Sequence, residues 1–263
     1  MDNLFIIKIG GNIVDDETKL AAFLKDFVAL QGIKVLVHGG GKVATKIGEQ
    51  LGITSKYVDG RRITDAATID LVTMVYAGLI NKKMVAALQQ LGCNAMGVTG
   101  ADANLVPAAK RPVKEIDYGF VGDVKSERLH AQTWQVLLDN GLVPVVAPIT
   151  HDEQGQLLNT NADTMAQEIA KALSKVYKVS LLYSFEKAGV LLDVNDDASV
   201  VKKLSNAYYQ QLKTEGKIFA GMIPKLDNAF AAIDAGVSRV IIGPAEALPA
   251  LTNGTAGTTI TNE

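Results

Sequence analysis

The sequence predicts an α/β protein, a three-layer α/β/α sandwich with an open, mostly parallel central sheet. Short apolar runs bounded by glycine or proline alternate with longer segments of helical periodicity. The apolar runs lack a regular polar alternation, which is typical of strands buried on both faces. Because strand and helix take turns along the chain, right-handed crossovers should place helices on both faces of the sheet.

Six apolar runs are the predicted strands, at residues 4–10, 33–39, 94–100, 142–149, 177–183 and 238–243. Seven segments between them have helical periodicity, at residues 17–30, 43–51, 66–91, 131–140, 162–173, 206–215 and 225–235. Three further stretches are predicted to form hairpins, at residues 56–64 around Asp59-Gly60, at 113–124, and at 147–159 around Gly155. A division near Leu173 would separate two lobes, 1–173 and 174–263.

Composition excludes some classes of partner. The 263 residues are 48% apolar and 21% charged, ordinary values for a globular enzyme. A net charge of −2 gives no basic field for nucleic acid or an anionic membrane, so we expect neither partner. No apolar run approaches the roughly 18 residues that a membrane span needs. Cys93 is the one cysteine and no signal-peptide pattern opens the chain, so a cytoplasmic protein is expected.

Lys8 ends the first predicted strand, in KIGGN, and is followed by Gly10 and Gly11. In open α/β sheets ligands bind beyond the carboxyl ends of the strands. A lysine removed from water there needs an anionic partner, and a phosphate would serve. The alternative is an edge-strand lysine that reaches solvent.

The second predicted strand ends in HGGGK, residues 38–42. Leu36 and Val43 stand where a Walker A motif requires glycine and serine or threonine, and the spacing of a dinucleotide fingerprint is also missing. The remaining interpretation is a set of exposed backbone N–H groups that form an anion nest ahead of a helix. A plain tight turn is the alternative.

Two predicted helices begin with unusual polar residues. In LLNTNADTMAQEIA, Asn161 or Asp163 would lie at the helix start, where capping explains either one. In GKIFAGMIPKLDNA, Pro224 suits a first helical turn. Lys225 beside it opposes the helix dipole, which suggests that an anion compensates its charge.

Five motifs together, KIGGN, VHGGGK, GRRIT, LLNTNADTMA and AGMIPKLDNA, resemble the amino acid kinase family over essentially the whole chain, and most closely its N-acyl-glutamate branch. The resemblance implies an amino acid kinase-like fold. It also implies ATP-dependent phosphorylation of the γ-carboxylate of N-acetyl-L-glutamate, the second step of arginine biosynthesis. Residues 1–173 would then bind the N-acyl-glutamate and form the dimer contact, and residues 174–263 would bind the nucleotide.

The resemblance also implies roles for single residues. Lys8 and Lys225 would flank the transferring phosphoryl group, and Asp163 would orient both lysines. The N–H groups of Gly39 and Gly40 would meet the γ-carboxylate, the phosphoryl group or both. Mg²⁺ would bridge the nucleotide phosphates and keep most of its waters, so no protein ligand to the metal is assigned. A carboxylate is already ionised at pH 7, so no general base is required.

Further contacts follow from the same resemblance. Arg62 would hold the α-carboxylate of the substrate through its bidentate fork, and Asn159 would be a second substrate contact. Gly10, Gly11 and Ser184, together with Lys8 and Lys225, would contact the nucleotide. The stretch LLYSFEKAGVLLD, residues 181–193, departs from the family pattern, which has a serine or threonine and an aspartate shortly before a glycine. Arg61 stands where many relatives have an apolar residue, and its role is open.

Alternatives remain at the level of the sequence. The acyl group could be succinyl, which would need a roomier or more cationic pocket. Other family members act on glutamate, aspartate, carbamate or uridine monophosphate, but GRRIT and NTNAD favour the N-acyl-glutamate branch. A non-catalytic sensor of nucleotide or amino acid would have no need for Lys8, Asp163 and Lys225 together.

Assembly is the last expectation. Arginine-inhibited members of the family carry an extra N-terminal helix that builds a hexameric ring. Only three residues precede the first predicted strand here, fewer than one helical turn. We therefore expect a homodimer, joined through the first lobe, whose activity is insensitive to L-arginine.

Overall fold

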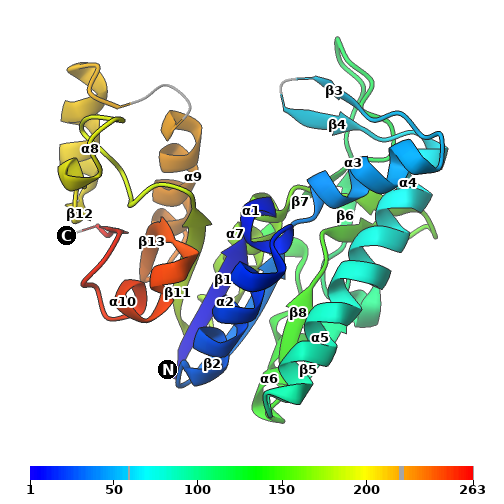
Figure 1. Ribbon diagram of the computed structural model, residues 1–263, viewed down its shortest axis with the longest axis horizontal. Coiled ribbons are helices and arrows are strands. Elements are labelled where there is room, and N and C mark those ends of the chain that lie inside the picture. The colour runs from blue at the N-terminus through cyan, green and yellow to red at the C-terminus, as the bar shows by residue number, and fades with distance from the viewer. Residues whose placement is uncertain (59, 219–221, 263) are drawn as a thin grey trace.

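A computed structural model describes residues 1–58, 60–218 and 222–262. Its centre is an eight-stranded sheet in the order β12-β14-β13-β11-β1-β2-β8-β5 (Figure 1). Neighbouring strands are parallel except for β13 and β14. The predicted open, mostly parallel sheet is therefore confirmed.

All six predicted strands belong to this sheet, as β1 (Asn3–Ile9), β2 (Ile33–His38), β5 (Ala95–Val98), β8 (Val143–Val146), β11 (Lys178–Phe185) and β13 (Arg239–Pro244). Two strands at one edge were not predicted, β12 (Lys203–Leu204) and β14 (Thr258–Ile260). Two or three residues are too few to show a strand period. β1 lies before the predicted boundary near Leu173 and β11 lies after it. Because these two strands pair, one continuous sheet spans both predicted lobes.

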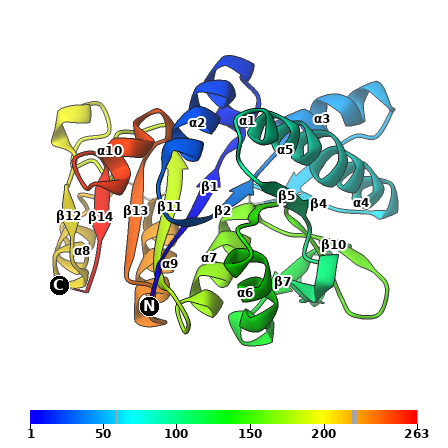
Figure 2. The same cartoon turned by 90° about the horizontal axis from the view of Figure 1, so that it is seen from below.

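Helices cover both faces of the sheet, as Figure 2 shows. One face carries α2 (Glu17–Ala29), α4 (Ala66–Val72), α5 (Asn81–Gln90) and α10 (Leu248–Thr252). The other carries α6 (Ala131–Asp139), α7 (Ala162–Leu173), α8 (Asn206–Thr214) and α9 (Ile223–Asp234). A separate apolar core fills each of the two interfaces, so the predicted three-layer sandwich is confirmed.

The remaining helices are short or lie at the ends of strands: α1 (Gly11–Val14), α3 (Gly41–Gln50), and the 3₁₀ turns η2 (Asp102–Asn104), η3 (Ser126–Arg128), η4 (Asp197–Ser199) and η6 (Ala245–Ala247). Both α1 and α3 begin directly after the glycines that follow β1 and β2. They bring helix N-termini to the carboxyl edge of the sheet.

Strand alternation decides which side chains reach which layer. On β1, Leu4 and Ile6 belong to the core beneath α7, and Ile7 and Ile9 to the core beneath α2. Lys8 follows the first pair and so faces the α7 layer. On β2 the same alternation turns His38 toward the α4–α5 layer.

The predicted helix over 66–91 exists, but its middle is a π-helix, η1 (Thr73–Ile80), between α4 and α5. By length and composition, the combined helix over 66–90 is the one stretch among the described residues that could cross a membrane. Val72, Tyr76 and Met84 on it are buried in the core against the sheet. This packing is that of a core helix.

Three hairpins project beyond the sheet edge. β3 (Lys56–Val58) pairs with β4 (Arg61–Ile63), and β9 (Ile149–His151) pairs with β10 (Leu157–Asn159), as predicted. Asp59 of the first turn lies outside the described residues. The predicted hairpin within 113–124 is wrong, because β7 (Gly122–Val124) pairs with β6 (Ala108–Lys110), before that stretch. The segment between β6 and β7 is instead the connection of a wider hairpin.

Candidate active site

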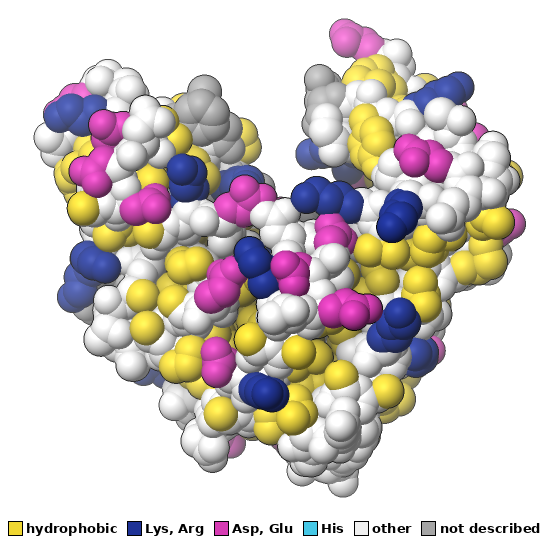
Figure 3. Space-filling model, viewed as in Figure 1, with side chains coloured by type: hydrophobic (Ala, Val, Ile, Leu, Met, Phe, Trp, Pro, Cys, Tyr) yellow, Lys and Arg dark blue, Asp and Glu magenta, His cyan; other side chains and the backbone are white. Residues whose placement is uncertain are grey.

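Two cavities open at the carboxyl edge of the sheet, where β1, β2 and β11 end. The larger, of about 1050 Å³, lies between the two arms of the molecule that Figure 3 shows. The smaller, of about 270 Å³, lies under the β3–β4 hairpin. Both are lined by Lys8, Gly10, Gly11 and Asp163, so the two cavities meet at these four residues. Two ligands bound side by side would face each other there.

Lys8 and Asp163 form an ion pair at this junction. The Nζ atom of Lys8 is 2.7 Å from Oδ1 of Asp163, and the lysine side chain is largely buried. This carboxylate oxygen is itself buried, so the lysine is its direct partner at the junction. The carboxylate therefore compensates the charge of the lysine, and an ammonium with three protons can still donate to a ligand.

The start of α7 frees Asp163 for that pairing. Asn161 is the N-cap of the helix, and its side-chain oxygen accepts hydrogen bonds from the backbone N–H groups of Asp163 and Thr164 at 2.9 and 3.0 Å. The sequence allowed either Asn161 or Asp163 to cap the helix, and in the structure the cap is Asn161. The side chain of Asp163 can then point across to β1.

The glycine turn after β2 supplies N–H groups, but not at both predicted positions. The N–H of Gly39 donates to the carbonyl oxygen of Ile9 at 3.1 Å, so the prediction that it meets the ligand does not fit this structure. The N–H groups of Gly40 and Gly41 have no partner among the described residues, and both glycines line the small cavity. A Cβ atom on Gly40 would lie 2.4 Å from Cδ1 of Ile80, so packing requires glycine there.

Arg62 is a buried cation with neutral partners. It is 7% exposed, and its Nη2 donates to the carbonyl oxygen of Gly41 at 2.8 Å and to Oγ1 of Thr45 at 3.0 Å. Nη1 donates to Ser55, and the guanidinium lies over the ring of Tyr57 at 4.9 Å. Among residues 1–58, 60–218 and 222–262 no carboxylate pairs with it. A buried charge of this kind calls for an anion from outside the protein.

Three other polar residues line the small cavity. Asn159 lies there with its amide donating to Oγ1 of Thr64 at 3.1 Å. Arg61, whose role was left open, is exposed at the rim. Arg111 was not predicted, because the hairpin was placed after it in the sequence. Its Nη2 lies 2.5 Å from Asp123, so its charge is already compensated within the protein.

Ser184 and Lys225, the predicted nucleotide contacts, line the large cavity. Pro224 lies in the first turn of α9, and Lys225 follows it. The ammonium of Lys225 lies over the ring of Phe185, 4.2 Å from its centroid. Among the described residues Asp163 pairs with Lys8 and not with Lys225, so the predicted orientation of both lysines by Asp163 is seen for Lys8 alone. Phe185 holds Lys225 instead.

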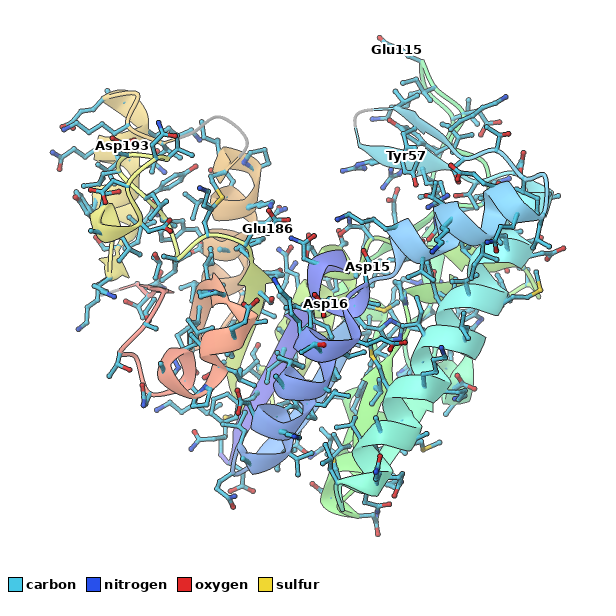
Figure 4. The ribbon with its side chains drawn as sticks, in the orientation of Figure 1. Asp15, Asp16, Tyr57, Glu115, Glu186 and Asp193 are labelled. Atoms are coloured by element: carbon cyan, nitrogen blue, oxygen red, sulfur yellow. The ribbon has the colours of Figure 1, made fainter. Side chains whose placement is uncertain are left out.

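Glu186 is a further carboxylate of the large cavity that the sequence did not single out. It accepts a hydrogen bond from the amide of Asn12, whose oxygen accepts from Lys42 at 2.9 Å. Figure 4 shows Glu186 between the arms, with Asp193 on one arm and Tyr57 on the other. Phe185 and Glu186, within the stretch 181–193 that departs from the family pattern, both line the large cavity.

The large cavity has the lining that a nucleoside polyphosphate needs. Five lysines line it, at positions 8, 19, 187, 217 and 225, along with four carboxylates, and Lys187 and Lys225 pair with no carboxylate among the described residues. Val190, Leu191, Ile218 and Met222 supply apolar surface. Cations suit phosphates, and apolar walls suit a purine ring.

Comparison with known proteins agrees with this geometry. The model of the amino acid kinase family matches residues 3–244. The chain belongs to the amino acid kinase family. Acetylglutamate kinase of Bacteroides fragilis is 58% identical over 247 residues, covering 94% of each chain. Acetylglutamate kinase of Cytophaga hutchinsonii is 58% identical over 254 residues, covering 96% of each.

Solved structures share the fold of this amino acid kinase. N-acetylglutamate synthase from Neisseria gonorrhoeae, complexed with coenzyme A and N-acetyl-glutamate, superposes with a TM-score of 0.81 at 21% identity, over 99% of this chain and 59% of that one. Carbamate kinase from Giardia lamblia bound to AMP-PNP gives 0.72 at 15% identity, over 100% and 99%. At these identities the likeness supports the fold and no more.

Proposed function

We propose that the chain is an ATP-dependent kinase that phosphorylates the γ-carboxylate of N-acetyl-L-glutamate, in arginine biosynthesis. The observation that carries the proposal is the meeting of two cavities at the Lys8–Asp163 pair, one cation-rich and large, the other small and holding the uncompensated Arg62. The 58% identity to two acetylglutamate kinases supports the choice of substrate.

The reaction would cross the junction in one displacement. An oxygen of the γ-carboxylate attacks the γ-phosphorus of ATP, a P–O bond forms, and the bond to the β-phosphate oxygen breaks as ADP leaves. No proton is transferred, so no base is needed. Catalysis then depends on positioning and on charge stabilisation. Lys8 lies at the junction and Lys225 on the nucleotide side, where their charges would stabilise the phosphoryl oxygens.

The two ligands would be held by different groups. In the small cavity Arg62 would bind the α-carboxylate, Asn159 a polar group of the substrate, and the N–H of Gly40 the reacting end. In the large cavity, which residues 174–263 line in large part, Gly10, Gly11 and Ser184 would contact the nucleotide. Mg²⁺ would supply charge neutralisation on the nucleotide phosphates while keeping most of its waters. Asp163, which pairs with Lys8, is the carboxylate that lines both cavities.

The balance of charge in the small cavity favours an acetyl over a succinyl substituent. A succinyl group adds a third carboxylate, which needs a further cation. Arg111 is already paired with Asp123, and Arg61 is exposed to solvent. Among the described residues, Arg62 is the one buried cation of this cavity that pairs with no carboxylate of the protein. It can compensate the α-carboxylate of the substrate, and no second such cation is present for the extra carboxylate of a succinyl group.

A hydroxamate assay tests the proposed function. The purified protein with ATP and Mg²⁺ is given N-acetyl-L-glutamate, N-succinyl-L-glutamate, L-glutamate and L-aspartate side by side, and the acyl phosphate is trapped with hydroxylamine. We expect the highest kcat/KM with N-acetyl-L-glutamate. A higher value with the succinyl compound would reassign the substrate. No product from any of the four would favour the non-catalytic sensor.

We also propose a homodimer in the cytoplasm. The exposed Met74 and Leu79 of the helix over 66–90 offer apolar surface that a second copy would cover. Light scattering on the purified protein should give the mass of two chains. The mass of one chain, or of six, would contradict the proposal.

A further inference from the structure

Behind the glycine turn lies a buried polar pair that neither ligand would touch. His38 is 0% and Asn81 1% exposed. The Nδ1 atom of His38 is 2.8 Å from the carbonyl oxygen of Gly39, and Nε2 is 3.2 Å from Nδ2 of Asn81. Nδ2 of Asn81 also donates to the carbonyl oxygen of Val145 at 2.9 Å. Because a carbonyl only accepts, Nδ1 carries the hydrogen and Nε2 accepts from Asn81, which requires the neutral ring.

This pair fixes the orientation of one peptide group. The carbonyl of Gly39 and the N–H of Gly40 belong to the same planar unit, and the described peptide bonds are all trans. In a trans peptide the C=O and the N–H point in opposite directions. Holding the Gly39 oxygen toward His38 therefore turns the Gly40 N–H away from the core. That N–H has no partner among the described residues, and Gly40 lines the small cavity.

The π-helical segment η1 makes both contacts possible from one helix. Tyr76 and Ile80 press on the position of Gly40, where an added Cβ would lie 3.0 and 2.4 Å from them. Asn81 reaches His38 from the next position. In a regular α-helix, residues five apart such as Tyr76 and Asn81 would be separated by about 140° around the axis. A turn with i to i+5 bonding brings them to the same side, and such segments often occur at functional sites.

We propose that His38 and Asn81 are positioning residues for phosphoryl transfer, which fix the Gly39–Gly40 peptide so that the Gly40 N–H faces the transferring group. This inference rests on the proposed function. The alternative is a buried histidine that only completes the core. If His38 is a positioning residue, activity depends on a hydrogen-bond donor at position 38 that is aimed at the Gly39 oxygen. If His38 only completes the core, activity depends on the volume of the side chain and on the stability of the protein.

Two substitutions separate these cases. In His38→Asn the amide nitrogen is as many bonds from Cβ as Nδ1 is, so the donor to Gly39 is kept. In His38→Gln the amide reaches the Nε2 position and the donor to Gly39 is lost. We expect kcat to stay within about threefold of wild type in His38→Asn. It should fall by about tenfold or more in His38→Gln, with KM for ATP unchanged, since a misaligned donor costs transition-state stabilisation.

A matched control and a second variant keep the test decisive. His151 bonds Asn104 at 2.8 Å and lines neither cavity, so His151→Gln should leave kcat unchanged. If His38→Gln does not fold, Asn81→Ser removes the partner of Nε2 and should lower kcat in the same direction. Equal kcat in His38→Asn and His38→Gln, or losses that follow the melting temperatures, would overturn the proposal.

A spectroscopic readout separates this proposal from the proposed function. In ¹⁵N–¹H spectra of the free protein, the Gly40 amide resonance should keep its position in His38→Asn and shift in His38→Gln. That result requires no turnover. If the wild type gave no acyl phosphate while the Gly40 resonance behaved as expected, the proposed function would fail, but the orientation of the Gly39–Gly40 peptide by His38 would be supported. An unshifted resonance in His38→Gln would overturn the claim that His38 orients this peptide.

Discussion

Arg62 shows how a single buried charge can define a binding site. Its hydrogen bonds go to a carbonyl and to hydroxyl groups, which orient the guanidinium without neutralising it. In the proposed pose Arg62 holds the α-carboxylate of the substrate, which keeps its charge through the reaction, so this contact would be equal in the ground state and the transition state. Loss of such a contact weakens binding more than it slows chemistry.

We predict that Arg62→Ala raises KM for N-acetyl-L-glutamate by at least about tenfold, with a smaller change in kcat. Steady-state kinetics with ATP saturating is the measurement. Arg61→Ala is the matched control, because Arg61 is the adjacent exposed arginine of the same cavity, and its KM should change much less. An unchanged KM in Arg62→Ala would contradict the proposed pose of the substrate.

A second single residue, His38, should make the free energy of unfolding depend on pH. Complete burial lowers its pKa from 6.5 to about 4, while its bond to Gly39 opposes the shift. Between these two values the unfolded chain binds a proton that the folded chain does not. The free energy of unfolding should therefore fall as the pH drops from about 6.5 to 4, by on the order of 3 kcal/mol.

Urea unfolding across this pH range tests the effect, with His38→Asn as the reference because it lacks the titrating group. The difference in unfolding free energy between the two proteins should change with pH only between about 6.5 and 4. A difference that is flat over that interval would show that His38 titrates normally in the folded state.

The position of Lys8 was predictable because it lies at a strand end, whereas Asp163 and Arg62 were assigned through the resemblance to the amino acid kinase family. The structure places Lys8 and Asp163 at the junction and Arg62 in the small cavity. The helix cap could be assigned to Asn161 only from the structure, because Asn161 and Asp163 both suit a helix start. The hydrogen bond from the N–H of Gly39 to Ile9 was also not predictable, because it depends on the register of β1 against β2.

At the scale of elements, the glycine turn and η1 fit each other closely. Gly40→Ala would add a Cβ within 2.4 Å of Cδ1 of Ile80 and 3.0 Å of the Tyr76 ring. We predict a loss of about 1–3 kcal/mol in unfolding free energy, the usual cost of overpacking. Gly39→Ala, whose Cβ would meet only the Ile9 oxygen at 3.8 Å, should change stability much less.

Denaturant unfolding of a double-mutant cycle checks this contact. Ile80→Val removes Cδ1, so adding it to Gly40→Ala should restore part of the lost stability. Strictly additive effects of the two substitutions would contradict the packing described for the turn.

Helices and strands were predictable where their hydrophobic periodicity extends over several residues, as in the helices and in the strands at the middle of the sheet. The π-helical segment was not predictable, because its apolar pattern is the same as that of a buried α-helix and only the backbone hydrogen bonds differ. The β6–β7 hairpin was misplaced because residues 111–121 separate its two strands, a much longer connection than in the two hairpins that were predicted.

At the scale of the whole molecule, the sheet brings distant segments to one edge. Parallel strands β1, β2 and β11 place residues near 8, 40 and 184 together, and α7 and α9 add Asp163 and Lys225. Lys225 lies over the ring of Phe185, and it lines the large cavity together with Asp163. The fold class was predictable from the alternation of strand and helix, but the division of the site into two cavities depends on how hairpins far apart in sequence meet.

The most direct test of phosphoryl transfer at the junction is the kcat of Lys8→Ala in the hydroxamate assay. Lys8 is shared by both cavities, so the account predicts a fall of roughly a hundredfold or more, the scale of losing one charge-stabilising donor. Lys171→Ala is the control, since Lys171 also pairs with a carboxylate, Glu168 at 2.9 Å, but lines neither cavity, and its kcat should stay near wild type. A folded Lys8→Ala protein with near-normal kcat would contradict the account.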